Sequence, residues 1–196
     1  MDTTIFINVV YIISAALFIF GLKLLGHPSS ARKGNMLSAV AMLIAIVVTL
    51  LDQHIVSFSW IIISVIAGSA VGVYVSKKVE MTGMPELVSL FNGVGGLASA
   101  AVAVAAMVGS DLTSGLATIS VIALIIGAVT FSGSLVAWGK LSERISGKPI
   151  VFDRQAIANY GLIGVTVLFS ALYVLYPSST LLICAVIALA LAIGVM

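Results

Sequence analysis

Long apolar segments make up most of the chain, and short clusters of charged or turn-forming residues separate them. There are seven such segments, at residues 3–25, 35–51, 58–76, 84–109, 116–139, 156–176 and 179–196. A helix that crosses the hydrocarbon core of a membrane needs about 20 mostly apolar residues, each rising about 1.5 Å. The pattern therefore predicts an all-α fold, a polytopic bundle of about seven transmembrane helices that forms a single transmembrane domain over residues 1–196.

The basic residues divide the connections between the segments into two groups. When the connections are numbered alternately, one side of the membrane holds every Lys and Arg of the chain, namely Lys23, Arg32, Lys33, Lys77, Lys78, Lys140, Arg144, Lys148 and Arg154. The other side holds Asp2, Asp52, His54 and Asp111. Because cytoplasmic loops carry the excess of Lys and Arg, we expect the N-terminus outside and the C-terminus in the cytoplasm. The same division favours an odd number of spans.

The composition excludes a water-soluble globule. Hydrophobic residues make up 61% of the chain, charged residues only 8%, and the mean hydropathy is +1.27. An ordinary soluble domain has roughly 25% charged residues, so much of this apolar surface must face lipid. The nine basic and seven acidic residues are too few and too scattered for a nucleic-acid-binding surface. We therefore expect the lipid bilayer as the environment and no nucleic-acid partner.

The residues offer no catalytic centre. Cys184 is the only cysteine and lies in an apolar run, which excludes an internal disulfide and a cysteine-ligated metal. Paired carboxylates, a nucleophile beside a base and a cluster of metal ligands cannot be assembled from the sequence. We therefore expect no catalytic residue, no metal site and no bound cofactor in this chain.

The last apolar segment is short for a transmembrane helix. About 18 residues cover roughly 27 Å, which barely spans the hydrocarbon core. The sequence stops at Val195 and Met196 without a basic or aromatic interfacial residue. We expect the chain to be a fragment whose continuation lies on the cytoplasmic side, and a naturally short terminal helix is the alternative.

The segment 84–109 opens with Pro85 and Glu86. Proline in the first turn and an acidic residue near the positive end of the helix dipole are typical of helix initiation, here at the membrane interface. A carboxylate this close to the apolar phase could also exchange protons with a pathway. Glu86 therefore has a structural and a functional interpretation.

Small and polar residues share one face of the same predicted helix. At intervals of three and four residues the chain places Ser89, Asn92, Gly96, Ser99 and Ala103. An amide in hydrocarbon costs several kcal/mol unless it is hydrogen-bonded, so Asn92 needs a partner helix or water. The face is either a packing seam held by one interhelical hydrogen bond or one wall of a hydrated proton or ion path.

The segment 116–139 carries a second group of polar residues. Thr130 and Ser134 are four residues apart and share a helix face. Hydroxyl groups in transmembrane helices bond by default to carbonyls of their own helix. These two could equally line a water chain opposite Asn92.

Several long runs resemble one family. They are Lys-Lys-Val-Glu-Met-Thr-Gly-Met-Pro-Glu-Leu-Val at residues 77–88, Asn92-Gly93 with Gly95-Gly96, Ile-Gly-Ala-Val-Thr-Phe-Ser-Gly-Ser-Leu-Val-Ala at 126–137, Gly-Lys-Leu at 139–141 and Lys148-Pro149. The chain resembles the beta subunit of the proton-translocating nicotinamide nucleotide (NAD(P)+) transhydrogenase, and the similarity extends over its whole length.

This resemblance implies a membrane component that couples inward proton flow to hydride transfer from NADH to NADP+. The chain would be part of an enzyme without holding its hydride-transfer site. In the family, two more helices and an NADP(H)-binding domain of the beta subunit follow the membrane part seen here. The alpha subunit supplies further helices and the NAD(H) domain. The implied complex is a homodimer in the bacterial plasma (inner) membrane.

The resemblance also assigns residues to the proton path. Some members have a path histidine at the position of Asn92, and Ser134 matches a serine that the family places on the same path. An amide does not titrate, so the titrating group would lie elsewhere. Together with the polar neighbours, the expected path residues are Asn92, Ser134, Thr130, Glu86 and Ser89.

Two hypotheses from other classes stay open beside this one. A stand-alone transporter of small solutes or ions would use Glu86, Asn92, Thr130 and Ser134 to line a cavity. A purely structural subunit would use the small-residue seams for assembly only. Alanine at both Asn92 and Ser134 would then be tolerated.

Overall fold

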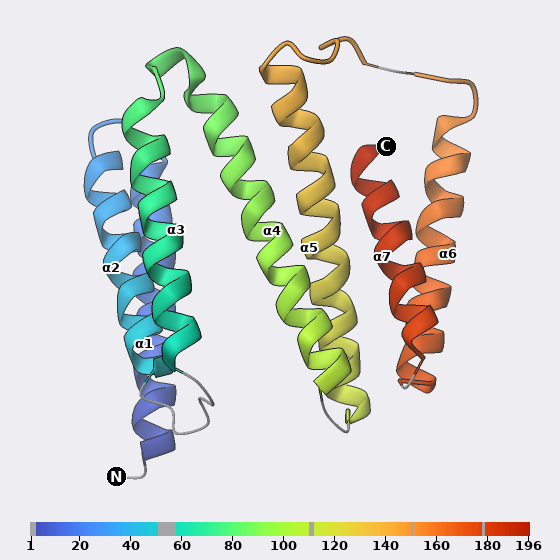
Figure 1. Cartoon of the computed structure of the whole chain (residues 1–196), viewed down its shortest axis with the longest axis horizontal. Helices are drawn as coiled ribbons and strands as arrows, with labels where there is room; N and C mark the ends of the chain where they lie inside the picture. The colour runs from blue at the N-terminus through green and yellow to red at the C-terminus, as the bar shows by residue number, and fades with distance from the viewer. Residues whose placement is uncertain (1–2, 51–57, 110–111, 150, 178) are drawn as a thin grey trace. The chain divides into compact units, whose positions relative to one another are not determined.

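The computed structural model describes residues 3–50, 58–109, 112–149, 151–177 and 179–196. In these ranges the chain is helical and forms no β-strand (Figure 1). The helices are α1 (Thr3–Leu25), α2 (Ala31–Leu50), α3 (Phe58–Lys78), the short 3-10 helix η1 (Met81–Gly83), α4 (Met84–Gly109), α5 (Ser114–Leu141), α6 (Gln155–Leu175) and α7 (Thr180–Val195). Six of them are long and apolar enough to cross a membrane, and α7, with 16 residues, is shorter. The predicted all-α fold is confirmed.

Most helix bounds differ from the predicted segments by only one or two residues, and α2 differs most. It begins at Ala31 rather than at residue 35, because Arg32 and Lys33 are good helix formers that extend the helix beyond its apolar part. At the start of α5, the side chain of Thr113 accepts a hydrogen bond from the backbone N–H of Leu116 at 3.4 Å. This N-cap adds residues before the apolar segment.

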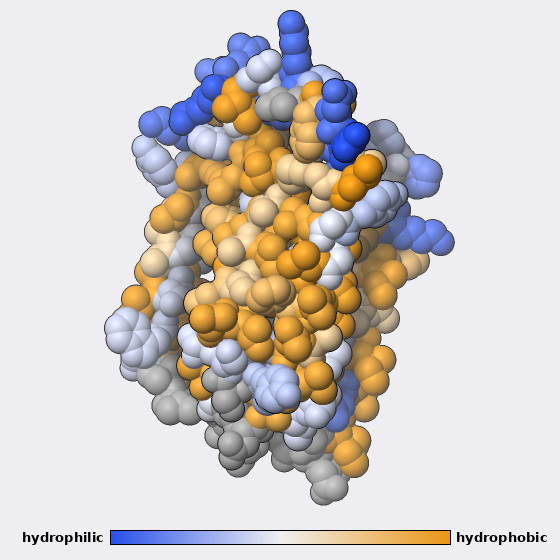
Figure 2. Space-filling model, turned by 90° about the vertical axis from the view of Figure 1, so that its right-hand side faces the viewer, coloured by the Kyte–Doolittle hydropathy of each residue, from blue (hydrophilic) through white to orange (hydrophobic). Residues whose placement is uncertain are grey.

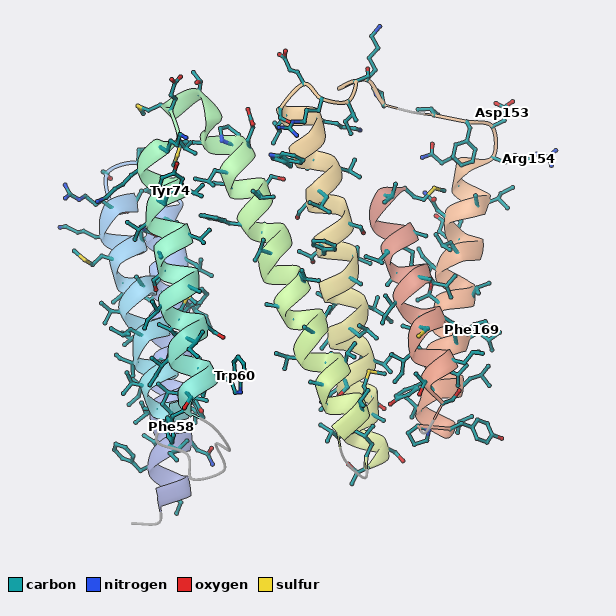
Figure 3. All side chains as sticks on the ribbon, viewed as in Figure 1. Phe58, Trp60, Tyr74, Asp153, Arg154 and Phe169 are labelled. Atoms are coloured by element: carbon teal, nitrogen blue, oxygen red, sulfur yellow. The ribbon has the colours of Figure 1, made fainter. Side chains whose placement is uncertain are left out.

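Apolar side chains cover the helices on the outside, as expected of a protein that faces lipid. Ile12 of α1 and Ile157 of α6 are 69% and 67% exposed. Figure 2 shows hydrophobic residues across the middle of the visible face and hydrophilic residues gathered at one end. Within α3, Phe58 and Trp60 lie near one end and Tyr74 near the other (Figure 3). Aromatic residues at both ends of a helix are typical of anchoring at the two membrane interfaces.

The helices group into two compact units, Met1–Val71 and Gly72–Met196. In the first, α1 packs against α2, and their backbones touch at two glycines. A Cβ on Gly34 would lie 2.6 Å from the carbonyl oxygen of Gly21. Tyr11 Oη and Thr49 Oγ1 share a hydrogen bond of 2.8 Å farther from the turn. Both contacts hold this helical hairpin together. That residues 1–196 form a single domain stays a prediction.

In the second unit α5 occupies the centre. It packs against α4 and against α7, and α7 in turn packs against α6 (Figure 1). Leu124, Tyr173 and Val186 are the largest fully buried side chains. At the contact of α5 with α7, a Cβ on Gly133 would lie 3.1 Å from the carbonyl oxygen of Gly194. Glycines therefore set the close approach of α5 to α7.

The basic residues of each unit lie near helix ends. Lys23, Arg32 and Lys33 surround the connection between α1 and α2. In the second unit, Lys140 lies in the last turn of α5 and Arg154 is the N-cap of α6. The acidic side of the predicted topology, Asp2, Asp52, His54 and Asp111, lies outside the described residues. The orientation in the membrane stays a prediction.

Candidate functional site

The start of α4 sets the depth of the candidate residues. η1 precedes the helix, Pro85 is its second residue and Glu86 lies in its first turn. Proline there sacrifices no helical hydrogen bond, and the carboxylate faces the positive end of the dipole. Asn92 follows Met84 by eight residues, which is about 12 Å along the helix axis. The amide is therefore well inside the apolar helix and not at its end.

A small polar cluster joins α4 to α5. Asn92 Nδ2 donates a hydrogen bond of 2.8 Å to Ser134 Oγ. One turn earlier, Ser89 Oγ donates a hydrogen bond of 2.9 Å to the backbone carbonyl of Ser134. Two residues of α4 thus bond to the same residue of α5, and Ser134 is only 8% exposed. The sequence left a partner helix or water as the partner of Asn92, and in the structure the amide bonds to a partner helix.

Glycines allow the two helices to approach closely enough for this contact. A Cβ on Gly93 would lie 3.1 Å from Ser134 Cβ, and a Cβ on Gly96 would lie 2.7 Å from the carbonyl oxygen of Gly127. A Cβ on Gly127 would lie 2.6 Å from the carbonyl oxygen of Gly96. Any side chain at Gly96 or Gly127 would therefore push the backbones apart.

Thr130 adjoins the cluster and Glu86 does not. Thr130 precedes Ser134 by one helical turn. Its Cβ lies 2.8 Å from the position that a Cβ on Gly96 would take. Glu86 is half-buried and, among the described residues, makes no ion pair or side-chain hydrogen bond. It is six residues from Asn92 and therefore about 120° away around the helix. The structure brings together Ser89, Asn92, Ser134 and Thr130.

The cluster leaves hydrogen-bonding capacity unused. Asn92 is exposed on the surface of this chain, and its Oδ1 accepts no hydrogen bond from the described residues. Ser134 Oγ accepts from Asn92, so its own hydroxyl hydrogen is free to donate. The pair therefore presents one acceptor and one donor to water or to a further polar group.

Sequence reasoning missed the partner glycine, Gly127. The sequence pattern placed Gly96 on the polar face of its predicted helix, but it did not identify Gly127 as the glycine that packs against Gly96. The available signal was that Gly127 lies seven residues before Ser134, and so on the same face of α5. A polar side chain and a glycine on one face indicate a close helix contact.

Comparison with known proteins places the chain in a family. The family model described as NAD(P) transhydrogenase beta subunit matches residues 7–196. Two curated relatives, both NAD(P) transhydrogenase subunit beta of Rhodospirillum rubrum, are 38% identical over 154 residues. The match covers 74% of this chain and 33% of each relative, so the chain spans about a third of the relatives' length. The chain belongs to the NAD(P) transhydrogenase beta subunit family.

Proposed function

We propose that this chain is the membrane part of a proton-translocating NAD(P)+ transhydrogenase, in which the seam between α4 and α5 lines the proton path. The complex would couple inward proton flow to hydride transfer from NADH to NADP+. The observation that carries the proposal is the interhelical hydrogen bond of 2.8 Å from Asn92 Nδ2 to Ser134 Oγ. Membership of the family supports the proposed reaction, and the polar cluster supports the proposed route of the protons.

Each residue of the cluster has a role that its chemistry allows. Ser134 can accept a proton on one side of its oxygen and donate its own on the other, which is how a hydroxyl relays protons. Asn92 does not titrate, so it orients Ser134 and water. Ser89 holds the Ser134 backbone through its hydrogen bond of 2.9 Å. The titrating group of the path would belong to another part of the complex.

The partners follow from the same proposal. We assign NAD(H) to the alpha subunit and NADP(H) to the nucleotide-binding domain of the beta subunit, both outside the present chain. The assembled enzyme would be a homodimer of the complex in a bacterial plasma membrane. The six long apolar helices support a multi-pass membrane location. A stand-alone transporter is not favoured, because the relatives at 38% identity are transhydrogenase subunits.

The test is the variant Asn92→Leu in the complete complex, reconstituted in vesicles. Leucine has the same branching and the same number of side-chain heavy atoms but cannot hydrogen-bond, so proton-linked turnover should fall at least tenfold. The control is Val94→Leu, because Val94 lies on the opposite face of α4 and is 54% exposed. Proton uptake is measured with a pH-sensitive dye during hydride transfer. Unchanged coupling in Asn92→Leu would remove the amide from the mechanism.

A further inference from the structure

The end of α5 places an arginine on a tryptophan. Trp138 lies close to the end of the helix, and the guanidinium carbon of Arg144 lies 4.7 Å from the centre of the Trp138 ring. An arginine over an aromatic ring at this distance is a cation–π pair. Stacking occupies one flat face of the guanidinium and leaves the N–H groups in its plane free. These groups donate no hydrogen bond to the described residues, and no described carboxylate pairs with Arg144.

Backbone hydrogen bonds fix the turn that carries Arg144. The backbone N–H of Arg144 donates to the carbonyl of Gly139 at 3.0 Å. That of Glu143, whose φ is 56°, donates to the carbonyl of Lys140 at 3.2 Å, a pattern that ends many helices. Ile145 then folds back over Gly139, and its Cδ1 would lie 3.1 Å from an added Cβ. The turn is therefore pinned to the helix and holds the guanidinium at the depth of the indole ring.

The last carbonyls of α5 do not engage the basic side chains of this turn. Besides the two backbone bonds, Ser142 Oγ donates a hydrogen bond of 2.7 Å to the carbonyl of Trp138. Basic side chains near a helix end often bond to its last carbonyls. Neither Lys140 nor Arg144 does so among the described residues. A ligand that approaches this end therefore meets free cationic groups.

The connection between α5 and α6 combines basic with apolar side chains (Figure 1). Residues 140–154 include four basic residues and two acidic ones, which gives a formal net charge of +2. Beside Lys148 and Arg154 lie Val151 and Phe152, and both of these apolar side chains are exposed. Exposed apolar groups beside basic ones suit a surface where hydrocarbon meets lipid headgroups. Tryptophan is enriched at the same depth, so the end of α5 fits the membrane interface.

We propose that Arg144, held on Trp138, binds the phosphate group of an anionic membrane lipid. A guanidinium donates two parallel N–H bonds to two oxygens of one phosphate, which a lysine ammonium cannot do. The positive charge of the connection favours an anionic headgroup such as that of phosphatidylglycerol. The exposed apolar side chains favour a lipid over a soluble acidic partner, because acyl chains can cover them. This site lies outside the Asn92–Ser134 pair and does not depend on the proposed function.

Photo-cross-linking tests the site in the complete complex. The complex is reconstituted in phosphatidylcholine vesicles that contain a small fraction of one of two probes. The probes are phosphatidylglycerol and phosphatidylcholine, each with a diazirine near the carboxyl end of one acyl chain. After illumination, mass spectrometry measures how much of each probe is attached to residues 135–149. We expect about fivefold more labelling by the phosphatidylglycerol probe, and equal labelling by the two probes would overturn the proposal.

Three variants separate a specific site from diffuse attraction. Arg144→Gln should abolish the preference for phosphatidylglycerol, and Arg144→Lys, which keeps the charge but loses the planar fork, should lower it at least threefold. The matched control is Arg32→Gln, which removes the same charge from an exposed arginine at the start of α2 and should keep the preference. Labelling by the phosphatidylcholine probe should be equal in all forms, which shows that each variant is folded and inserted.

Two results with these variants would overturn the site. The first is a preference that survives in Arg144→Gln or falls equally in Arg32→Gln, because the attraction would then be diffuse. The second is a full preference in Arg144→Lys, because charge alone would then suffice.

The source of the phosphate is tested in the same vesicles. Inorganic phosphate added at constant ionic strength should leave the labelling unchanged, because it lacks the acyl chains that hold a lipid at the interface. If inorganic phosphate abolishes the preference, the site binds soluble phosphate and the lipid assignment is overturned. Labelling is measured without turnover, so its outcome is distinct from the coupling of Asn92→Leu, and either proposal can fail alone.

Discussion

Replacing Gly127 by alanine tests whether the contact between α4 and α5 is as close as the structure indicates. The new Cβ would lie 2.6 Å from Ala100 N and 2.6 Å from the carbonyl oxygen of Gly96. Ordinary van der Waals contact for such an atom begins at 3.4 Å, so the helices must separate by 3.4 − 2.6 = 0.8 Å. Both opposing atoms belong to the backbone, and no side-chain rotation relieves the clash.

The free energy of this change follows from two opposing effects. Overpacking of a close contact costs about 1–3 kcal/mol, whereas alanine in place of glycine within a helix gains about 0.5–1 kcal/mol. If the separation reaches Asn92, its hydrogen bond of 2.8 Å to Ser134 lengthens to 2.8 + 0.8 = 3.6 Å, which is no longer a hydrogen bond. An interhelical hydrogen bond in a membrane contributes about 0.6 kcal/mol. We expect Gly127→Ala to lower the free energy of unfolding by about 1–2 kcal/mol.

The assay compares this variant with Gly95→Ala. A Cβ on Gly95 has no neighbouring atom within 4 Å, so that substitution keeps the helical gain without the clash. Unfolding of the reconstituted complex in mixed micelles is followed by circular dichroism as sodium dodecyl sulfate is added. Proton-linked turnover of the same samples should fall only in Gly127→Ala. Equal stability and turnover of the two variants would refute the close contact.

Two further predictions use single positions. Glu143 follows α5 with a φ of 56°, a left-handed conformation that favours glycine. Glu143→Gly should raise the free energy of unfolding by about 1 kcal/mol, and an equal gain in Glu143→Ala would contradict this explanation. Asn92→His replaces an amide that does not titrate by an imidazole that does. The ratio of its proton-linked turnover to that of the parent enzyme should therefore change between pH 5 and pH 8. A ratio that is constant from pH 5 to pH 8 would argue against Asn92 lying on the path.

The helices themselves could be predicted because each long apolar run marks a membrane-spanning helix. The start of α2 at Ala31 was the main error, since helix propensity continues through Arg32 and Lys33 after the apolar run has ended. The polar face of α4 was also predictable from its spacing. That these residues line a proton path stays a prediction.

The pairing of specific residues could not be predicted. Helical periodicity gives the faces of α4 and α5, but it does not say how far one helix slides along the other. That register places Ser134 against Asn92 and Gly127 against Gly96. A shift of one turn would separate both pairs while leaving each face unchanged.

Close packing and polar chemistry in this seam depend on one another. An amide at Asn92 is tolerated in hydrocarbon only if it is hydrogen-bonded, and its bond to Ser134 requires the helix approach that Gly93 and Gly96 permit. Because Asn92 uses an N–H group for this bond, its Oδ1 still accepts and the Ser134 hydroxyl still donates. In the proposed path, these two groups would bond to water. A proton relay needs both, an acceptor on one side and a donor on the other.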